Sequence, residues 1–220
     1  MLTRTKTLVR MALVMAVWPG SRCVGQPSDR DLRSIETIVV IYAENRSFDA
    51  LYGTFPGANG IRDASTSSLV QRDRDGSVLK ELPPVWGGLT PMGVEPEISQ
   101  ARTEHLSNRP FSIDDPVGFG LPLSVPTRDL WHRFYQNQMQ INGGHNDMFV
   151  AYADSGALVM GHYDGSTLPM WSVARRYVLA DNFFMGAFGG SFLNHIWLIC
   201  ACAPGGLVPM RIPRTRKSRL

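Results

Sequence analysis

IETIVVIYAENRSFD, residues 35–49, begins as a run of apolar and β-branched side chains and ends in a carboxylate and an amide. A nearly continuous hydrophobic run of this length is typical of a buried parallel strand. In open α/β sheets, ligands bind beyond the carboxyl ends of such strands. We therefore expect a strand over residues 35–43 and a functional site at Glu44 and Asn45.

Glu44 and Asn45 offer two adjacent oxygen donors, which suit a hard or borderline divalent cation. The structural alternative is that the Glu44 carboxylate accepts backbone hydrogen bonds and that Asn45 caps a short helix over 47–52. The two residues alone do not decide between these readings.

The composition is that of a folded protein, with 44% hydrophobic and 10% aromatic residues among 220. The net charge of +3 comes from the two ends of the chain. Eight of the 22 Lys and Arg residues lie in residues 1–10 and 211–220, so the other 14 face 19 Asp and Glu residues. Since the interior has no basic stripe with interleaved aromatic residues, we predict no nucleic-acid partner.

Residues 1–25 have the pattern of a signal peptide. Three basic residues precede the apolar run 11–18, and small residues follow it. Eight apolar residues are too few to cross a bilayer, and no later run is a candidate. We predict an exported bacterial protein, secreted or periplasmic, without an integral membrane span.

Residues 57–126 are irregular and rich in Pro and Gly, and we expect this long loop to cover a site. Hydrophobic spacing predicts helices over 127–142, 146–153 and 168–176, with a short strand over 177–181. Cys200 and Cys202 lie two residues apart in an apolar run, where we expect buried small side chains rather than a bridge.

Gly189-Gly190-Ser191 stands at the mouth of an apolar helix that runs to Ala203. Glycines let a ligand approach the backbone, and a helix N-terminus suits a phosphate group. A serine hydroxyl at this place can attack phosphorus once a divalent cation activates it. Asn194 and His195 share its helix face. The alternative is that Ser191 is only a helix cap.

An acyl-transfer serine hydrolase is a rival interpretation of Ser191. Its nucleophile turn reads Gly-x-Ser-x-Gly, whereas position 193 of this chain is Leu. His195 could serve as the base, but a pair four residues apart in one helix is not the usual arrangement of a catalytic triad. A non-catalytic binding module is the third class of function.

Five ordered blocks resemble the bacterial phosphoesterase family, which holds respiratory-burst-inhibiting acid phosphatases and bacterial phospholipases C. The first block, 38–49 with Tyr52-Gly53, looks like its opening motif, and FGGSFLNH at 188–195 is similar to its nucleophile block. The middle blocks are QINGG at 140–144, VMGHYD at 159–164 and LADNFF at 179–184. The resemblance covers about residues 35–204, and the serine at 191 is closer to the acid phosphatase branch.

The resemblance implies an α/β fold, an alkaline-phosphatase-like α/β/α sandwich with the long irregular loop between its first strand and its middle helices. It implies that Glu44, Asn45 and Ser191 bind a divalent metal ion of unknown identity. Ser191 would also be the nucleophile and Asn194 a substrate-binding residue. His132 would contact the phosphate or protonate the leaving group, unless it is only a structural histidine.

The resemblance also implies a metal-dependent hydrolase of phosphoric esters, acting on a phosphate ester or a phospholipid. Members of the family take further metal ligands, a pair of adjacent aspartates, from a later part of the domain. We therefore expect residues 26–204 to be the N-terminal part of that domain, truncated and weakly active or inactive, and residues 205–220 to be a basic tail outside the family pattern. A non-catalytic remnant of the same fold and, third, a serine carboxylesterase are the alternatives. The oligomeric state is not predicted.

Overall fold

The computed structural model describes residues 33–202 of the chain. The expected signal peptide at 1–25 and the expected tail at 205–220 lie outside these residues. The chain divides into two units, which are Met1–Ala43 and Glu44–Leu220. Each unit is described by itself below.

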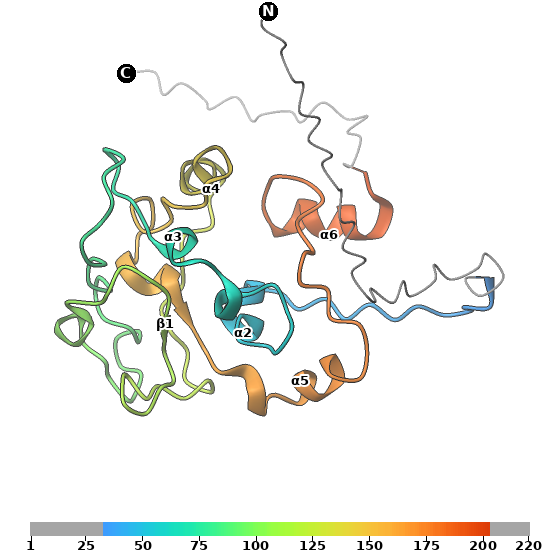
Figure 1. The fold of residues 1–220 in the computed structure, drawn as a ribbon, viewed down its shortest axis with the longest axis horizontal. Helices are drawn as coiled ribbons and strands as arrows, with labels where there is room; N and C mark the ends of the chain where they lie inside the picture. The colour runs from blue at the N-terminus through green and yellow to red at the C-terminus, as the bar shows by residue number, and fades with distance from the viewer. Residues whose placement is uncertain (1–32, 203–220) are drawn as a thin grey trace, which may run out of the picture. The chain divides into compact units, whose positions relative to one another are not determined.

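Short helices and a very small sheet make up the regular structure of the described residues (Figure 1). The sheet pairs β1 (Phe111–Ser112) in parallel with β2 (Gly161–His162), with Phe111 opposite Gly161. The α-helices described below are α2 (Phe48–Tyr52), α3 (Thr66–Leu69), α4 (Phe134–Ile141), α5 (Pro169–Ala174) and α6 (Ser191–Cys200). Short 3₁₀ helices cover Ile61–Asp63, Gln100–Thr103, Asn142–Gly144, Gly156–Met160 and Gly165–Thr167.

The mixed α/β class is confirmed, but the expected strand at 35–43 is wrong. Residues 35–43 form no strand, and the side chains of Ile38 and Val39 are 77% and 78% exposed. A strand needs a neighbour to pair its N–H and C=O groups, and the strand ladder of residues 33–202 joins only β1 and β2. The second expected strand, at 177–181, is also absent, and Val178 is 94% exposed. The described residues therefore show a two-stranded sheet rather than a full sandwich.

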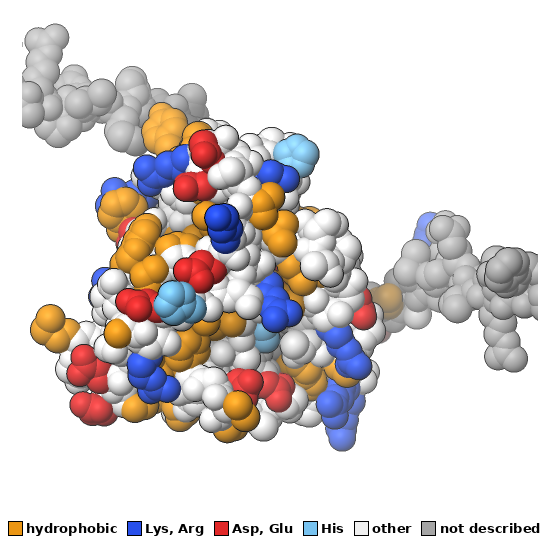
Figure 2. Space-filling model, turned by 60° about the vertical axis from the view of Figure 1, so that its left-hand side comes forward, with side chains coloured by type: hydrophobic (Ala, Val, Ile, Leu, Met, Phe, Trp, Pro, Cys, Tyr) orange, Lys and Arg blue, Asp and Glu red, His pale blue; other side chains and the backbone are white. Residues whose placement is uncertain are grey.

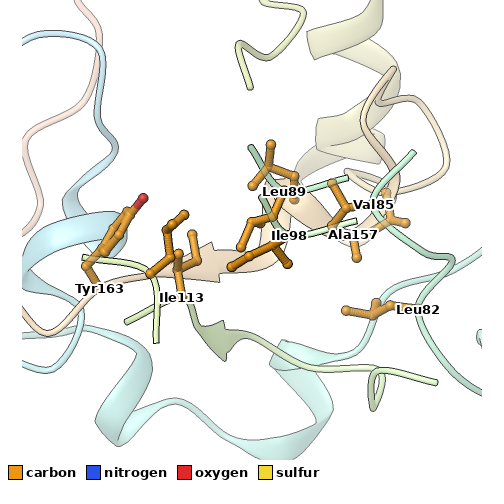
Figure 3. Close-up of a cluster of buried hydrophobic side chains, with 10 residues drawn as sticks. Leu82, Val85, Leu89, Ile98, Ile113, Ala157 and Tyr163 are labelled. Carbon is orange, nitrogen blue, oxygen red and sulfur yellow. The ribbon is translucent and has the colours of Figure 1, made fainter. Parts of the chain in front are cut away.

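Six of the ten buried core residues lie within the irregular region 57–126 that we expected to be a covering loop, and the other four lie between 150 and 163. Side chains from well-separated turns meet there without a helical or strand period (Figure 3). Leu89 and Ile98 are 0% and 1% exposed, and the Leu89 N–H donates to the Ile98 carbonyl at 2.8 Å. The buried cluster comprises Leu82, Val85, Leu89, Ile98, Ile113, Leu121, Val150, Ala157, Leu158 and Tyr163.

Buried polar side chains hold the backbone of these irregular turns. The Thr103 hydroxyl accepts from the Val85 N–H at 2.8 Å. The Gln71 side chain is also buried, and its carbonyl oxygen accepts from the Phe149 N–H at 2.8 Å. A buried backbone N–H group without a hydrogen-bond partner destabilises the fold. These side chains supply the partners that a neighbouring strand supplies in a sheet.

Local capping explains the start of α2 and the end of α4. The Ser47 side chain, not Asn45, caps α2 by accepting from the Ala50 N–H at 3.2 Å. Helix α4 ends as expected at Asn142, which has a left-handed φ of 46°, but it begins at Phe134 rather than at 127. The helix expected over 146–153 is wrong, because those residues form turns.

Two further expectations concern the chain near α6. Cys200 and Cys202 form a disulfide and are exposed, so the prediction of buried, unbridged thiols is wrong. Among residues 33–202, no helix has the length and apolar character needed to cross a bilayer. On the face drawn in Figure 2, basic and acidic side chains are interspersed with hydrophobic ones.

Candidate active site

Ser191 is the first residue of α6, and its side chain is exposed. Gly190 precedes the helix with an extended backbone and offers no side chain to cap it. The first N–H groups of the helix therefore lack a capping side chain from Gly190 and carry the partial positive charge of a helix N-terminus. A serine hydroxyl next to such groups is well placed to meet a phosphoryl oxygen or phosphorus.

The Asn194 side chain organises the turn that leads into Ser191. Its amide nitrogen donates to the carbonyls of Gly190 at 3.2 Å and Gly189 at 3.3 Å. Its amide oxygen accepts from the Ala187 N–H at 3.4 Å. Asn194 is thus half-buried behind the turn and holds it against the first turn of α6. Its expected role in substrate binding stays a prediction.

Glu44 lies beside the same helix, although 151 residues separate it from its partner there. The His195 Nε2 atom is 3.1 Å from the Glu44 Oε2 atom. Since a carboxylate only accepts, His195 Nε2 carries the hydrogen of this contact. The two side chains are 46% and 43% exposed. The structure therefore joins Glu44 to α6 through His195, one helical turn after Ser191.

Asn45 follows Glu44 in the left-handed region, with a φ of 63°. Asparagine adopts this conformation more easily than most side chains. The guanidinium of Arg46 donates to the Asn45 carbonyl at 2.9 Å. This turn carries the chain from Glu44 into the cap of α2.

His132 lies before α4 and is exposed. Its Nδ1 atom is 2.9 Å from the Leu130 carbonyl oxygen, so Nδ1 carries a hydrogen and Nε2 is the atom left to meet a ligand. Two residues on, the Phe134 ring packs edge-on against the Phe188 ring with centroids 4.9 Å apart. This contact ties the start of α4 to the turn before Ser191.

The expected metal site is not complete within the described residues. Glu44, Asn45 and Ser191 supply one carboxylate, one amide and one hydroxyl, whereas a hard cation usually takes six or more oxygen ligands. No group of three or more His, Cys, Asp or Glu side chains that could hold a metal ion occurs in residues 33–202. These residues therefore do not by themselves fit a bound metal.

The other acidic side chains near the family blocks have structural partners. Asp114 accepts from the Asp164 N–H through both carboxylate oxygens, at 3.1 and 3.0 Å, and so links β1 to β2. Asp181 accepts from the Asn59 N–H at 2.7 Å and fixes the segment before α6. None of these hydrogen bonds involves Glu44.

The contact of His195 with Glu44 was not predicted from the sequence. We considered His195 as a base only in the rival esterase interpretation, and the structure places it against the carboxylate of Glu44. Its spacing of four residues from Ser191 was the available signal, since such residues share a helix face.

The matching family model is the Phosphoesterase family, over residues 35–211 of this chain. The chain therefore belongs to the Phosphoesterase family, a family of phosphoric ester hydrolases. It is 27% identical over 188 residues to the phospholipase C A proteins of Mycobacterium tuberculosis strains CDC 1551 / Oshkosh and ATCC 25618 / H37Rv. The aligned region covers 82% of this chain and 32% of each relative, so the chain spans about a third of their length. No solved structure matches it.

Proposed function

We propose that this chain carries the nucleophile of a phosphoric ester hydrolase and that the nucleophile is Ser191. The observation that carries the proposal is the place of Ser191 at the first position of α6, in a chain of this family, with Glu44 held beside the same helix. A helix N-terminus favours the negative charge of a phosphoryl group, and an exposed hydroxyl is accessible to it.

In the proposed reaction, the Ser191 oxygen attacks phosphorus in line with the ester oxygen. The P–O bond to the leaving group breaks, the serine proton passes to solvent water, and the departing alcohol takes up a proton. Water then attacks the phosphoserine, which returns Ser191 and releases inorganic phosphate or a phosphomonoester. The first N–H groups of α6 lie where they can stabilise charge on the phosphoryl oxygens.

One histidine and one asparagine have assigned places in this proposal. As an imidazolium, His132 would donate the Nε2 proton to the leaving oxygen, while its Nδ1–H stays hydrogen-bonded to the Leu130 carbonyl. Asn194 would contact the phosphoryl group if its amide shifts from the Gly190 carbonyl, and otherwise positions Ser191 through the turn.

A divalent cation bound by Glu44, Asn45 and Ser191 is also part of the proposal. When bound, such an ion neutralises phosphoryl charge and activates a hydroxyl. Because the described residues provide only one carboxylate for it, stable binding requires further ligands from outside them. We therefore propose that the 220-residue chain turns over phosphate esters weakly or not at all, even where it can accept one phosphoryl group.

The substrate is proposed as a phosphomonoester or a phospholipid. The relatives are phospholipases C by name, which favours a phospholipid. Export across the bacterial membrane, as the first 25 residues predict, would bring the protein to such substrates outside the cytoplasm.

A single-phosphorylation experiment tests the function separately from turnover. The purified chain is incubated with excess p-nitrophenyl phosphate and Mg²⁺ or Mn²⁺, and Ser191 is examined by mass spectrometry. We expect phosphoserine at position 191, its loss in Ser191→Ala and its loss with a chelator. The matched control is Ser172→Ala, since Ser172 is an exposed serine of helix α5. Absence of phosphate at Ser191, or labelling that Ser191→Ala leaves intact, would contradict the proposal.

A serine carboxylesterase is the second candidate, because the His195–Glu44 pair stands one turn after Ser191. A parallel assay with p-nitrophenyl acetate separates the two. Acetylation of Ser191 that survives the chelator, without phosphorylation, would favour the esterase. A chain that accepts neither group would support the non-catalytic module.

A further inference from the structure

The contact between His195 and Glu44 joins the two family blocks that lie farthest apart in the sequence. His195 Nε2 lies 3.1 Å from Glu44 Oε2, and 151 residues separate the two. Glu44 stands three residues before the Ser47 cap of α2, and His195 lies four residues after Ser191 in α6. This contact thus connects the turn at 44–47 to the helix of the proposed nucleophile.

Each side of this contact has its own anchor. On one side, α2 is bound to the end of the small sheet, because the Tyr163 N–H donates to the Ala50 carbonyl at 2.9 Å. On the other side, Asn194 locks the turn before Ser191 to the first turn of α6. The Glu44 side chain would sample many directions if it were held only by its own flexible stem. His195 restricts it to the side of α6.

We propose that His195 is a positioning residue, which holds the Glu44 carboxylate beside α6, the helix that begins with the nucleophile Ser191, and thereby supports phosphorylation of Ser191. The inference rests on the proposed function of Ser191. Side chains of a helix tilt toward its N-terminus, so the imidazole of His195 leans toward the turn that contains Ser191. When a functional side chain is oriented by a neighbouring residue, removal of that neighbour lowers the activity of the site.

A role in stability alone does not account for this contact. Both side chains are close to half exposed, and exposed ion pairs contribute little to folding. A second pair of the same kind, His105 with Glu81 at 3.2 Å, lies outside both family blocks and offers a matched control. If the two pairs are only surface contacts, removing either histidine should have the same small effect.

The experiment compares His195→Ala, His195→Gln and His105→Ala in the full 220-residue chain. Glutamine keeps an N–H donor near the position of Nε2 but cannot act as a base. We expect His195→Ala to slow phosphorylation of Ser191 by p-nitrophenyl phosphate roughly tenfold. We expect His195→Gln to stay within about threefold of the wild type, and His105→Ala to match it. Far-UV circular dichroism confirms that each variant is folded.

Amide hydrogen exchange of residues 44–52 provides a readout that does not depend on catalysis. Loss of the contact should speed exchange in this segment in His195→Ala, but not in His195→Gln or His105→Ala. If the variants show this exchange pattern but the wild type carries no phosphoserine at Ser191, the proposed function fails while the positioning of Glu44 by His195 stands.

Three results would overturn the positioning role. The first is unchanged exchange over 44–52 in His195→Ala. The second is unchanged phosphorylation in that variant when the wild type is phosphorylated. The third is a His195→Gln variant with normal exchange and phosphorylation as slow as His195→Ala, which would make His195 a proton-transfer group instead.

Discussion

The packed core and the segments that carry the family's chemistry differ in how they are held. The core is made of turns between about 82 and 163, whose side chains are almost fully buried. The segment from 177 to 200 leaves large side chains exposed, with Ile199 at 84%. The core is thus stabilised by packing, whereas the site depends on a few polar contacts.

This difference shows that the segments carrying Glu44 and Ser191 are separate in sequence from the buried cluster, although the family block at 159–164 contributes Tyr163 to that cluster. Ser191 is placed by the Asn194 amide, and Glu44 is placed by His195. The segment that carries Ser191 also leaves large apolar side chains such as Ile199 exposed. We expect substitutions in the core to change stability and substitutions around the site to change phosphorylation.

The largest effect is expected from Leu89→Ala in the core. Leu89 is fully buried, so the substitution removes apolar contacts and leaves a cavity. Large-to-small changes of this kind cost about 2–5 kcal/mol of unfolding free energy. The matched change Ile199→Ala should cost less than about 0.5 kcal/mol, since surface substitutions usually do. Urea denaturation followed by tryptophan fluorescence measures both. Equal losses in the two variants would remove the distinction between the regions.

Gly156→Ala tests how tightly the irregular turns of the core are packed. Gly156 has a φ of 60°, and a Cβ atom there would collide with the Pro84 carbonyl oxygen. We expect a loss of about 2–4 kcal/mol, because strain from the left-handed backbone adds to an overpacked contact. Gly57 has a φ of 83° but nothing within 4 Å of its Cβ position. Gly57→Ala should therefore lose only about 1 kcal/mol. If the urea midpoint of Gly156→Ala is as high as that of Gly57→Ala, the turn at Gly156 can relax to accept the methyl group.

Local chemistry predicts part of this fold from the sequence. Residues 47–52 and the start of α6 at Ser191 follow from capping serines, glycines and hydrophobic spacing. The core does not follow, because Leu89 and Ile98 meet through irregular turns that have no period to detect. The strand at 35–43 fails for another reason. A run of apolar, β-branched residues favours an extended backbone, but a strand also needs a neighbouring strand, and the described residues form no ladder with this segment.

The site was predictable to a different degree. The sequence alone suggests Ser191 at a helix start and Glu44 at the end of an apolar run, and only the resemblance links them. The structure connects Glu44 to α6 through His195, a long-range contact between exposed side chains. No local rule predicts which histidine meets a carboxylate 151 residues away.

A moderate effect is expected from pH through His162, at the end of β2. Burial lowers the pKa of His162 below its ordinary value of 6.5, although the Tyr163 backbone and nearby carboxylates partly oppose this. Between the folded and the unfolded pKa of His162, the unfolded chain binds more protons than the folded chain. The free energy of unfolding is therefore unaffected by this group above about pH 6.5 and falls as the pH drops toward the pKa of the folded state.

His162→Phe should flatten this part of the pH profile. The side chain borders a cavity of about 360 Å³, and its Nδ1 atom has no hydrogen-bond partner in the part of the chain that the structure describes. Melting temperatures from pH 7.5 down to 5 measure the effect, where each 1 kcal/mol corresponds to about 2–4 °C. His145→Asn, at an exposed histidine, is the control and should keep the wild-type slope. A wild-type slope in His162→Phe would assign the pH dependence to other groups.

The smallest effect is expected from Cys202→Ser. The disulfide joins Cys200 and Cys202 at the exposed end of α6, away from the buried cluster of the core. Because global unfolding depends on the core, we expect the urea midpoint to change by less than the equivalent of about 0.5 kcal/mol. Amide exchange in the last turn of α6 should rise, since that turn loses its covalent closure. A large fall in the midpoint would show that α6 unfolds together with the core, and the site would then share the stability of the packed region.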